Sequence, residues 1–332
     1  MILPNVEPYR VVEPMYEGIR VILNYHGEMY SPAYVQGISG AAFHVSGICP
    51  CAPTCTEGIA PFELVRKFGY QAEAMPLFNE TVHVDQRAPD DLMNALIERI
   101  KAEINAKLPV LVWHAFSSCE WNVVAGYDAD AGTDHRKLFF GCSPYPWLTE
   151  APQTRPRDAF EKCPAFGAIF IGEKTGKFDA QVAEIASLRE AVAQAKSQKN
   201  VDKLGGSDWV FLQGFLAYER WVNDFRNPQK TRDLGDAYCY DVYRSTHRSA
   251  SDYLAELSEK YPQARNPLLE ASRHFAVEAD ILSKGESLLW WSSPEGPDPT
   301  RNQQAAALLD QSFTSYRRRI ESIEKAVEIL AM

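Results

Sequence analysis

Glu120 is the acidic residue whose sequence context best suits chemistry. It lies between two apolar runs, Val110–Trp113 and Trp121–Tyr127, which predict consecutive buried strands. Burial beside aromatic side chains would raise the pKa of its carboxyl group and suit it to general acid–base work on an amide or ester. The alternative is a glutamate at a strand edge that is solvated or paired with arginine.

Two polar residues next to these strands could complete such a site. Asn122 lies two positions after Glu120, on the same strand face, and could either donate to an oxyanion or satisfy the backbone. His114 follows Trp113 and is the closest histidine to Glu120 in sequence. It could act as a base, and the alternative is a hydrogen-bonded histidine of the core.

Three cysteines lie within seven residues in the segment Cys49-Pro50-Cys51-Ala52-Pro53-Thr54-Cys55, shortly after His44. Thiolate clusters bind zinc or iron–sulfur centres. The spacing matches no standard zinc pattern, and no second cysteine pair accompanies it, so we predict neither a metal nor a cofactor. The alternatives are small apolar fillers of a proline-rich loop, or a nucleophile at Cys49 or Cys51 that works with Glu17 or Glu120.

Composition excludes several classes of partner. The 332-residue chain has a formal net charge of −10, which leaves no basic footprint for nucleic acid or for an anionic membrane surface. The first residues lack the cationic start and apolar core of a signal peptide, and no apolar run is long enough to span a membrane, so we expect a cytoplasmic protein. Seven cysteines, an odd number, favour reduced thiols over disulfides.

The first part of the chain mixes helices and strands. We predict helices over residues 17–26, 61–68 and 89–107, with glycines at 27 and 69 ending the first two. Strands are expected over residues 70–77, 110–113, 121–127, 138–141 and 167–171, and the small residues from Gly37 to Phe43 suit a turn buried under the sheet. This order predicts an α+β domain over residues 1–172.

Residues 176–332 are predicted to form an all-helical domain, a bundle that covers and stabilises the first. Ser207 would cap an aromatic helix from Trp209 to Phe225, and longer helices would follow over residues 234–261, 268–289 and 306–330. Arg244 lies on one helix face with Tyr240 and His247. It could bind a carboxylate or phosphate of a small ligand, and the alternative is an interhelical ion pair.

Several motifs of the first domain resemble those of papain-like peptidases of the bacteriocin-processing type and of the butirosin-biosynthesis acyltransferase N-terminal domain. They are the run ending YHG at Gly27, the segments YVQGISGAAF and FELVRKFGY, and the pair PVLVW and EWNVVAGYD. The resemblance covers about half the chain. It implies a papain-like fold with a nucleophilic cysteine at the start of the first core helix, a histidine before the second strand of the pair, and an aspartate at the end of the next strand.

None of these catalytic residues is present at the matching position. The first helix begins with Tyr16, Glu17 and Gly18 and has no thiol, Glu120 replaces the histidine, and Cys142 begins the segment Cys142-Ser143-Pro144 in place of the aspartate. A thiolate nucleophile needs an adjacent base and a group that orients it. We therefore expect no papain-type peptide hydrolysis, since function resides in the site and not in the fold.

The sequence thus predicts a non-peptidase relative of this superfamily, a hydrolase or acyltransferase that acts on a small amide or acyl substrate in bacterial specialised metabolism. Its site would be a cleft between the domains, lined by Trp113, Glu120, Trp121 and residues 16–18. One alternative is a catalytically inactive ligand-binding or scaffold protein, and another is a thiol-dependent enzyme with a displaced cysteine. A small molecule is the expected partner, and a homodimer is left open.

Overall fold

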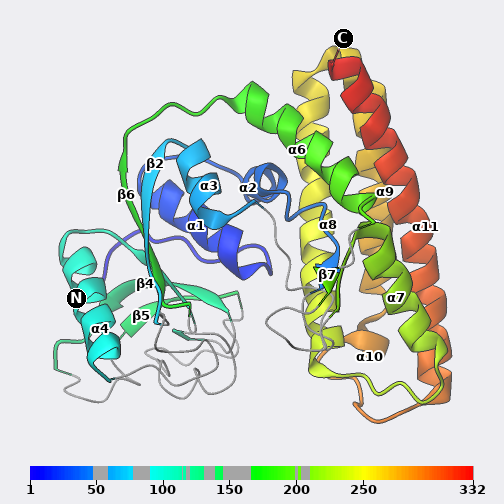
Figure 1. Cartoon of the computed structure of the whole chain (residues 1–332), viewed down its shortest axis with the longest axis horizontal. Coiled ribbons are helices and arrows are strands. Elements are labelled where there is room, and N and C mark those ends of the chain that lie inside the picture. The colour runs from blue at the N-terminus through cyan, green and yellow to red at the C-terminus, as the bar shows by residue number, and fades with distance from the viewer. Residues whose placement is uncertain are drawn as a thin grey trace. The chain divides into compact units, whose positions relative to one another are not determined.

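The computed structural model describes residues 1–47, 59–77, 90–113, 115–116, 120–130, 139–144, 166–198, 201–202 and 210–331. The chain forms two compact units. Unit 1 comprises Met1–Val35 and Pro61–Asp179, and unit 2 comprises Gln36–Ala60 and Ala180–Met332. Unit 1 combines helices with a five-stranded sheet, whereas unit 2 is mainly helical (Figure 1). The predicted α+β class is confirmed.

Unit 1 is built on an antiparallel sheet with the strand order β2-β6-β3-β4-β5. The strands are β2 (Tyr70–Met75), β3 (Val110–Trp113), β4 (Trp121–Tyr127), β5 (Phe139–Cys142) and β6 (Ala168–Lys174). Strands β3 and β4 pair with Trp113 opposite Trp121. The two strands predicted on either side of Glu120 are therefore present, and Glu120 directly precedes β4.

Helices cover both faces of this sheet. Val110 and Val112 of β3 belong to the same core cluster as Ile100 of α4 (Asp90–Asn105), whereas Leu111 lies against Gly18 of α1 (Pro14–Tyr25). Because successive side chains of a strand point to opposite faces, α1 and α4 lie on opposite sides of the sheet. Burial on both faces explains why these strands have continuous apolar sequences and no alternation. A short helix, α3 (Pro61–Lys67), precedes β2.

Unit 2 is a bundle of long helices. They are α6 (Ala180–Ala195), α7 (Gly214–Arg226), α8 (Leu234–Lys260), α9 (Arg265–Ser283), the short α10 (Glu286–Leu289) and α11 (Pro299–Leu330), with one turn of 3₁₀ helix at Pro262–Ala264. Helix α9 packs against both α8 and α11, and α11 also packs against α6 and α7. The predicted helices near 234–261 and 306–330 are confirmed, whereas the one predicted over 268–289 is divided between α9 and α10.

Unit 2 is not all-helical, which corrects the prediction. Strands β1 (Ser46–Gly47), β8 (Val210–Gln213) and β7 (Val201–Asp202) form a small antiparallel sheet. The aromatic helix therefore begins at Gly214 and not near Ser207, which lies outside the described residues. Gly214 has φ +55°, and a Cβ atom there would lie 2.2 Å from the carbonyl oxygen of Ala195, so this position needs glycine.

The segment Gln36–Ala60 belongs to unit 2, although the sequence prediction placed it in the N-terminal domain. The end of α2 (Pro32–Ser39) packs closely on α8, because a Cβ atom on Gly37 would lie 2.3 Å from the ring of Tyr253. The hydroxyl of Tyr243 donates to the carbonyl of Ser46 and accepts from its N–H, both at 3.0 Å. The small residues thus allow close packing on a helix, and the buried turn that follows over residues 40–43 is present but belongs to unit 2 and not to the unit with the five-stranded sheet.

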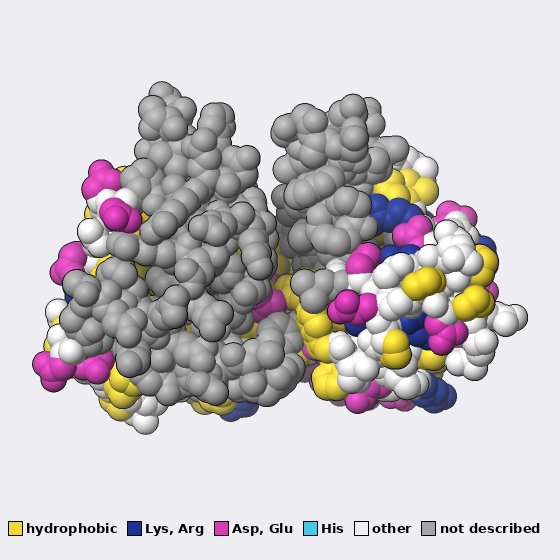
Figure 2. Space-filling view, turned by 90° about the horizontal axis from the view of Figure 1, so that it is seen from below, with side chains coloured by type: hydrophobic (Ala, Val, Ile, Leu, Met, Phe, Trp, Pro, Cys, Tyr) yellow, Lys and Arg dark blue, Asp and Glu magenta, His cyan; other side chains and the backbone are white. Residues whose placement is uncertain are grey.

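No helix in the described ranges is long and apolar enough to cross a membrane. In the view of Figure 2, the described surface of unit 2 carries both acidic and basic side chains, interspersed with hydrophobic ones. Mixed charges of this kind are typical of a solvated surface.

Candidate functional site

The carboxylate of Glu13 closes the N-terminus of α1. Its oxygens accept N–H bonds from Met15, Tyr16 and Glu17 at 3.0, 2.8 and 3.2 Å, and the residue is buried. Pro14 occupies the first helical position, where no N–H is needed. The free N–H groups that let a helix N-terminus bind an anion are thus already used.

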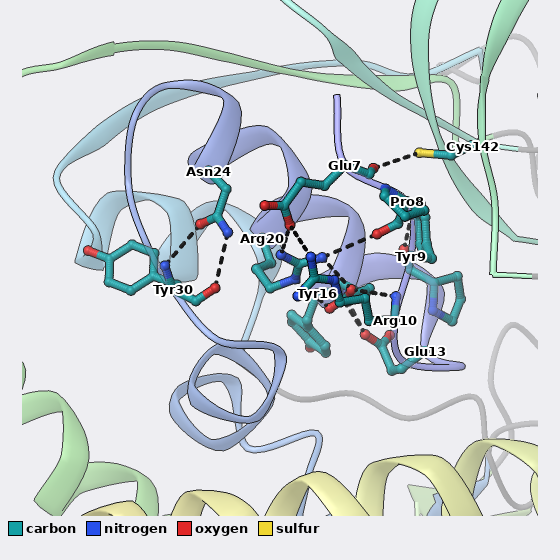
Figure 3. A network of polar contacts seen from close by, with 12 residues as sticks. Glu7, Pro8, Tyr9, Arg10, Glu13, Tyr16, Arg20, Asn24, Tyr30 and Cys142 are labelled. Atoms are coloured by element: carbon teal, nitrogen blue, oxygen red, sulfur yellow. Dashed lines mark hydrogen bonds and ion pairs between the residues drawn. The ribbon is translucent and has the colours of Figure 1, made fainter. Parts of the chain in front are cut away.

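Glu17 and Arg20 form a buried ion pair one turn further along α1. Figure 3 shows Arg20 pointing toward Glu7 and Pro8. Arg20 is bidentate, with Nε 2.9 Å from Oε2 and Nη2 2.7 Å from Oε1 of Glu17. The backbone N–H of Arg10 donates to the same carboxylate at 2.8 Å, and Nη1 of Arg20 lies 2.6 Å from Oε2 of Glu7. Both oxygens of Glu17 therefore have structural partners.

The charges of this network depend on one another. Burial raises the pKa of Glu17, and the hydrogen bonds from Arg20 offset part of that increase. Burial lowers the pKa of Arg20, but the carboxylates of Glu17 and Glu7 raise it more, so that the net direction is upward. We take the pair as ionised, because a bidentate arginine favours the charged form of a carboxylate.

Tyr9 fills the space beside the first turn of α1. Its hydroxyl lies 3.2 Å from the carbonyl oxygens of both Pro14 and Trp121, and so it joins α1 to the start of β4. A Cβ atom on Gly18 would lie 2.6 Å from this hydroxyl and 2.5 Å from a methyl group of Leu111. Burial raises the pKa of Tyr9 well above its usual range.

The predicted ligand-binding residues at the helix start are thus enclosed. Tyr16 and Glu17 are buried, and Gly18 has Tyr9 and Leu111 packed against it. The resemblance places a nucleophile at this point of the fold. This chain instead has a capped helix, an ion pair and a packed tyrosine there.

Glu120 directly precedes β4, whose first residue, Trp121, belongs to a cluster of aromatic rings. Glu120 is only 2% exposed. The rings of Trp113 and Trp121 lie 5.5 Å apart, and Phe166 lies 5.0 Å from Trp113 and 6.4 Å from Trp121. Phe166 is 39% exposed, so the aromatic cluster (Trp113, Trp121 and Phe166) reaches the surface. Burial is the largest cause of the raised pKa of Tyr9, and the charge of Glu120 adds a smaller increase.

Asn122 is fully buried, opposite Val112 in the neighbouring strand. Its Oδ1 accepts the N–H of Phe116 at 2.8 Å, and so it holds the chain that follows β3. Satisfying the backbone was one of its two predicted roles, and this contact supports it. The other predicted catalytic residues, His114 and Cys49, lie outside the described residues, as do Cys51 and Cys55.

Cys142 is a packed thiol at the end of β5. Its Sγ donates to the carbonyl oxygen of Glu7 at 3.5 Å, and burial raises its pKa to about 12. Such a thiol lacks the exposed, electropositive surroundings that make a cysteine reactive. Outside the gaps given above, no three His, Cys, Asp or Glu side chains are grouped to hold a metal ion.

We predict that iodoacetamide at pH 8 leaves Cys142 unmodified in the folded protein. At that pH a thiol with a pKa near 12 is about a thousandfold less ionised than an ordinary one, and only the thiolate reacts. Peptide mass spectrometry after short labelling, with a urea-unfolded sample as control, measures the modified fraction. Equal labelling in the two samples would contradict the prediction.

Arg244 belongs to α8 of unit 2, whereas Glu120 and its aromatic neighbours belong to unit 1. Its guanidinium lies 2.9 Å from Asp241 and 3.5 Å from Glu286, and stacks on the ring of Tyr240. These contacts are those of the ion-pair alternative considered from the sequence. The described residues therefore give Arg244 a structural role.

Sequence reasoning missed Tyr9, Glu13 and Arg20. An acidic residue directly before Pro14 is a usable signal for a helix start, and the spacing of Glu17 and Arg20 suits a pair on one helix face. No local pattern points to Tyr9. Its contact with Trp121 joins positions 112 residues apart.

Neither a scan against protein-family models nor a search of curated proteins found a match for this chain.

Proposed function

We propose that unit 1 binds a small organic ligand at Glu120 and the aromatic cluster, and that it does not hydrolyse peptides. The observation that carries this proposal is the burial of Glu120, 2% exposed, directly before Trp121, whose ring packs against that of Trp113. Removing a carboxylate from water has a large free-energy cost, so a buried carboxylate usually has a specific role. Apolar surroundings with a few polar groups are typical of ligand sites.

The chemistry of the cluster indicates the kind of ligand. Aromatic faces attract flat apolar groups and cations, and a carboxylate accepts hydrogen bonds from N–H groups. Phe166 is the exposed member of the cluster, and Glu120, next to Trp121 in the chain, is buried. We therefore propose a small molecule that has a flat or aliphatic part and carries an amine or amide.

The closed start of α1 argues against a nucleophilic mechanism. The groups that would surround a nucleophile already have structural partners in Glu13, Glu17 and Tyr9. At Gly18 there is no space for a side chain. The papain-like scaffold is part of the proposal, as an inactive descendant of such enzymes. A cytoplasmic location, a role in bacterial specialised metabolism and a homodimer remain predictions.

A second candidate function is hydrolysis or acyl transfer on a small amide or acyl substrate. It is favoured by the burial of Glu120, because a carboxyl group removed from water is suited to general acid–base work. Glu120 would then act as the acid or base at the start of β4. A displaced nucleophile at Cys49 or Cys51 stays a prediction.

We predict that Glu120→Gln keeps the fold but abolishes ligand binding. The amide preserves the shape of the side chain and removes a buried charge, so the melting temperature should stay equal or rise. Native mass spectrometry of the full chain, purified without denaturant, first identifies the retained small molecule. Titration of that molecule into both proteins then measures the loss of affinity.

Glu98→Gln is the matched control, because Glu98 is 72% exposed and lies on the surface of α4 in the same unit. It should change the free energy of unfolding by no more than about 0.5 kcal/mol. Its affinity for the ligand should be unchanged. Phe166→Ala should weaken binding without unfolding the protein. A Glu120→Gln variant with unchanged affinity would end the proposal, and turnover of the ligand by the parent protein would favour the second candidate.

A further inference from the structure

The interior of unit 2 holds ionisable side chains from three helices. His247 of α8, Glu278 of α9 and Arg319 of α11 are each 0% exposed. Of these, sequence reasoning noticed only His247, as a neighbour of Arg244. Charged groups are almost never fully buried unless they are paired, so this cluster needs a physical explanation.

Glu278 is the shared acceptor of the cluster. The hydroxyl of Tyr218 on α7 donates to its Oε1 at 2.9 Å. Its Oε2 lies 3.0 Å from Nδ1 of His247 and forms an ion pair with Nη1 of Arg319. One carboxylate therefore faces three groups: among the described residues Tyr218 makes a hydrogen bond to it, whereas His247 and Arg319 are ion-pair contacts of Oε2.

Arg319 uses only one end of its guanidinium in this pair. Its plane stacks on Phe275 at 3.8 Å and on Tyr316 at 4.1 Å. Within the described part of the chain none of the three guanidinium nitrogens makes a hydrogen bond, and Nε and Nη2 have no ion-pair partner either. These two nitrogens form one edge of the guanidinium, and a pair of parallel N–H groups matches the two oxygens of a carboxylate.

Other polar atoms of the same interior are also unpartnered; Nε2 of His247 becomes a donor only when the ring is protonated, because in the neutral ring Nδ1 carries the proton that faces Glu278. Nε2 of His247, the hydroxyl of Tyr316 and Nε1 of Trp221 have no hydrogen-bond partner among the residues with described side chains. Nearly all buried polar groups in proteins have such a partner, and leaving one unpaired is costly. The unpartnered groups are mainly donors, so they call for an acceptor.

We propose that the interior of unit 2 is a binding site for a small carboxylate, with Arg319 as its anchor and His247 as the group that takes up a proton when the anion binds. Bundle cores commonly hold such sites, built from side chains of facing helices. The site is independent of Glu120, since it lies in the other unit. The anion would accept from Nε and Nη2 of Arg319 while Glu278 keeps Nη1.

Charge balance explains why His247 should take up a proton when an anion binds. Burial lowers the pKa of Arg319, but the adjacent carboxylate of Glu278 favours the charged guanidinium, and we take the two as neutralising each other. A bound anion would then leave one excess negative charge unless His247 becomes protonated. Burial, and then the charge of Arg319, lower the pKa of His247, which is therefore neutral in the free protein. The other ionisable groups around it are Tyr218, Tyr243 and Tyr316. A bound anion favours the charged imidazole, so affinity should be higher at pH 6 than at pH 8.

Formate and acetate are the probes, added as sodium salts to the full-length chain at pH 6 and pH 8. We expect a saturable rise in melting temperature at pH 6 that sodium chloride of equal ionic strength does not give, with a much weaker effect at pH 8. Arg319→Lys should bind at least tenfold more weakly, because lysine cannot present two parallel N–H groups.

Arg244→Lys is the matched control, since Arg244 is likewise an arginine paired with carboxylate groups in the same unit but is 28% exposed. It should keep full binding. If Arg319→Lys does not fold, His247→Gln provides the test, because its affinity for the anion should be the same at pH 8 and at pH 6. Failure of both anions to stabilise the parent protein, or loss of binding in Arg244→Lys alone, would overturn the proposal.

Discussion

Arg20→Met is expected to lower the free energy of unfolding of unit 1 by about 3–5 kcal/mol, the range found when one partner of a buried ion pair is removed. Arg20 is 1% exposed, and it is bidentate to Glu17 and paired with Glu7. Methionine fills much of the same volume but leaves the carboxylate of Glu17 buried without its counter-charge. Urea unfolding of the full chain, followed by tryptophan fluorescence and circular dichroism, measures the change.

Arg99→Met is the matched control in the same unit. Arg99 also pairs with two carboxylates, Glu73 at 3.1 Å and Glu103 at 2.8 Å, but it is 40% exposed. Exposed pairs contribute little, so its loss should lower stability by no more than about 1 kcal/mol. Equal losses of stability in the two variants would show that burial does not increase the contribution of the Arg20 network to the free energy of unfolding.

Gly37→Ala is expected to destabilise unit 2 by about 3 kcal/mol through overpacking. Gly37 lies in helix α2, where alanine is otherwise the better residue by about 1 kcal/mol. The sign is reversed because three ring atoms of Tyr253 would lie 2.3–2.5 Å from the new Cβ atom. Tyr253 is fully buried, and its hydroxyl is 2.9 Å from that of Ser187, so the ring has little freedom to move.

A double-mutant cycle with Tyr253→Leu tests whether this contact is the cause. The double variant should be less destabilised than the sum of the two single variants, with a coupling of about 1 kcal/mol or more. Gly296→Ala is the control, because no atom lies within 4 Å of a Cβ atom there. A stabilising Gly37→Ala, or strict additivity in the cycle, would contradict the assignment of residues 36–60 to unit 2.

The two proposed sites differ in how far sequence could reveal them. Glu120 stands between two apolar runs, so its position at a strand start could be predicted locally. His247, Glu278 and Arg319 are spread over about 70 residues of helical sequence that shows only amphipathic periodicity. A helical pattern tells which face is buried, but not which polar residue of one helix meets that of another.

The sequence by itself determined the local elements and the α+β class. The helix that ends near Gly27, the strands on both sides of Glu120 and the long helices of unit 2 follow from apolar periodicity and from residues with strong backbone preferences. The absence of a cysteine at the start of the first helix was likewise evident from the residues alone. These properties depend on neighbours within one or two turns of the chain.

Only the tertiary structure decided which distant residues meet. It joined Tyr9 to Trp121, packed Gly37 against Tyr253, and paired Ser46 with Gln213 in a sheet that the sequence did not suggest. A strand of two to four residues has too little pattern to be distinguished from a loop, and its pairing is fixed by packing between distant segments. The polar partners that give Glu17 and Glu278 their roles are set in the same way, by contacts that no local pattern encodes.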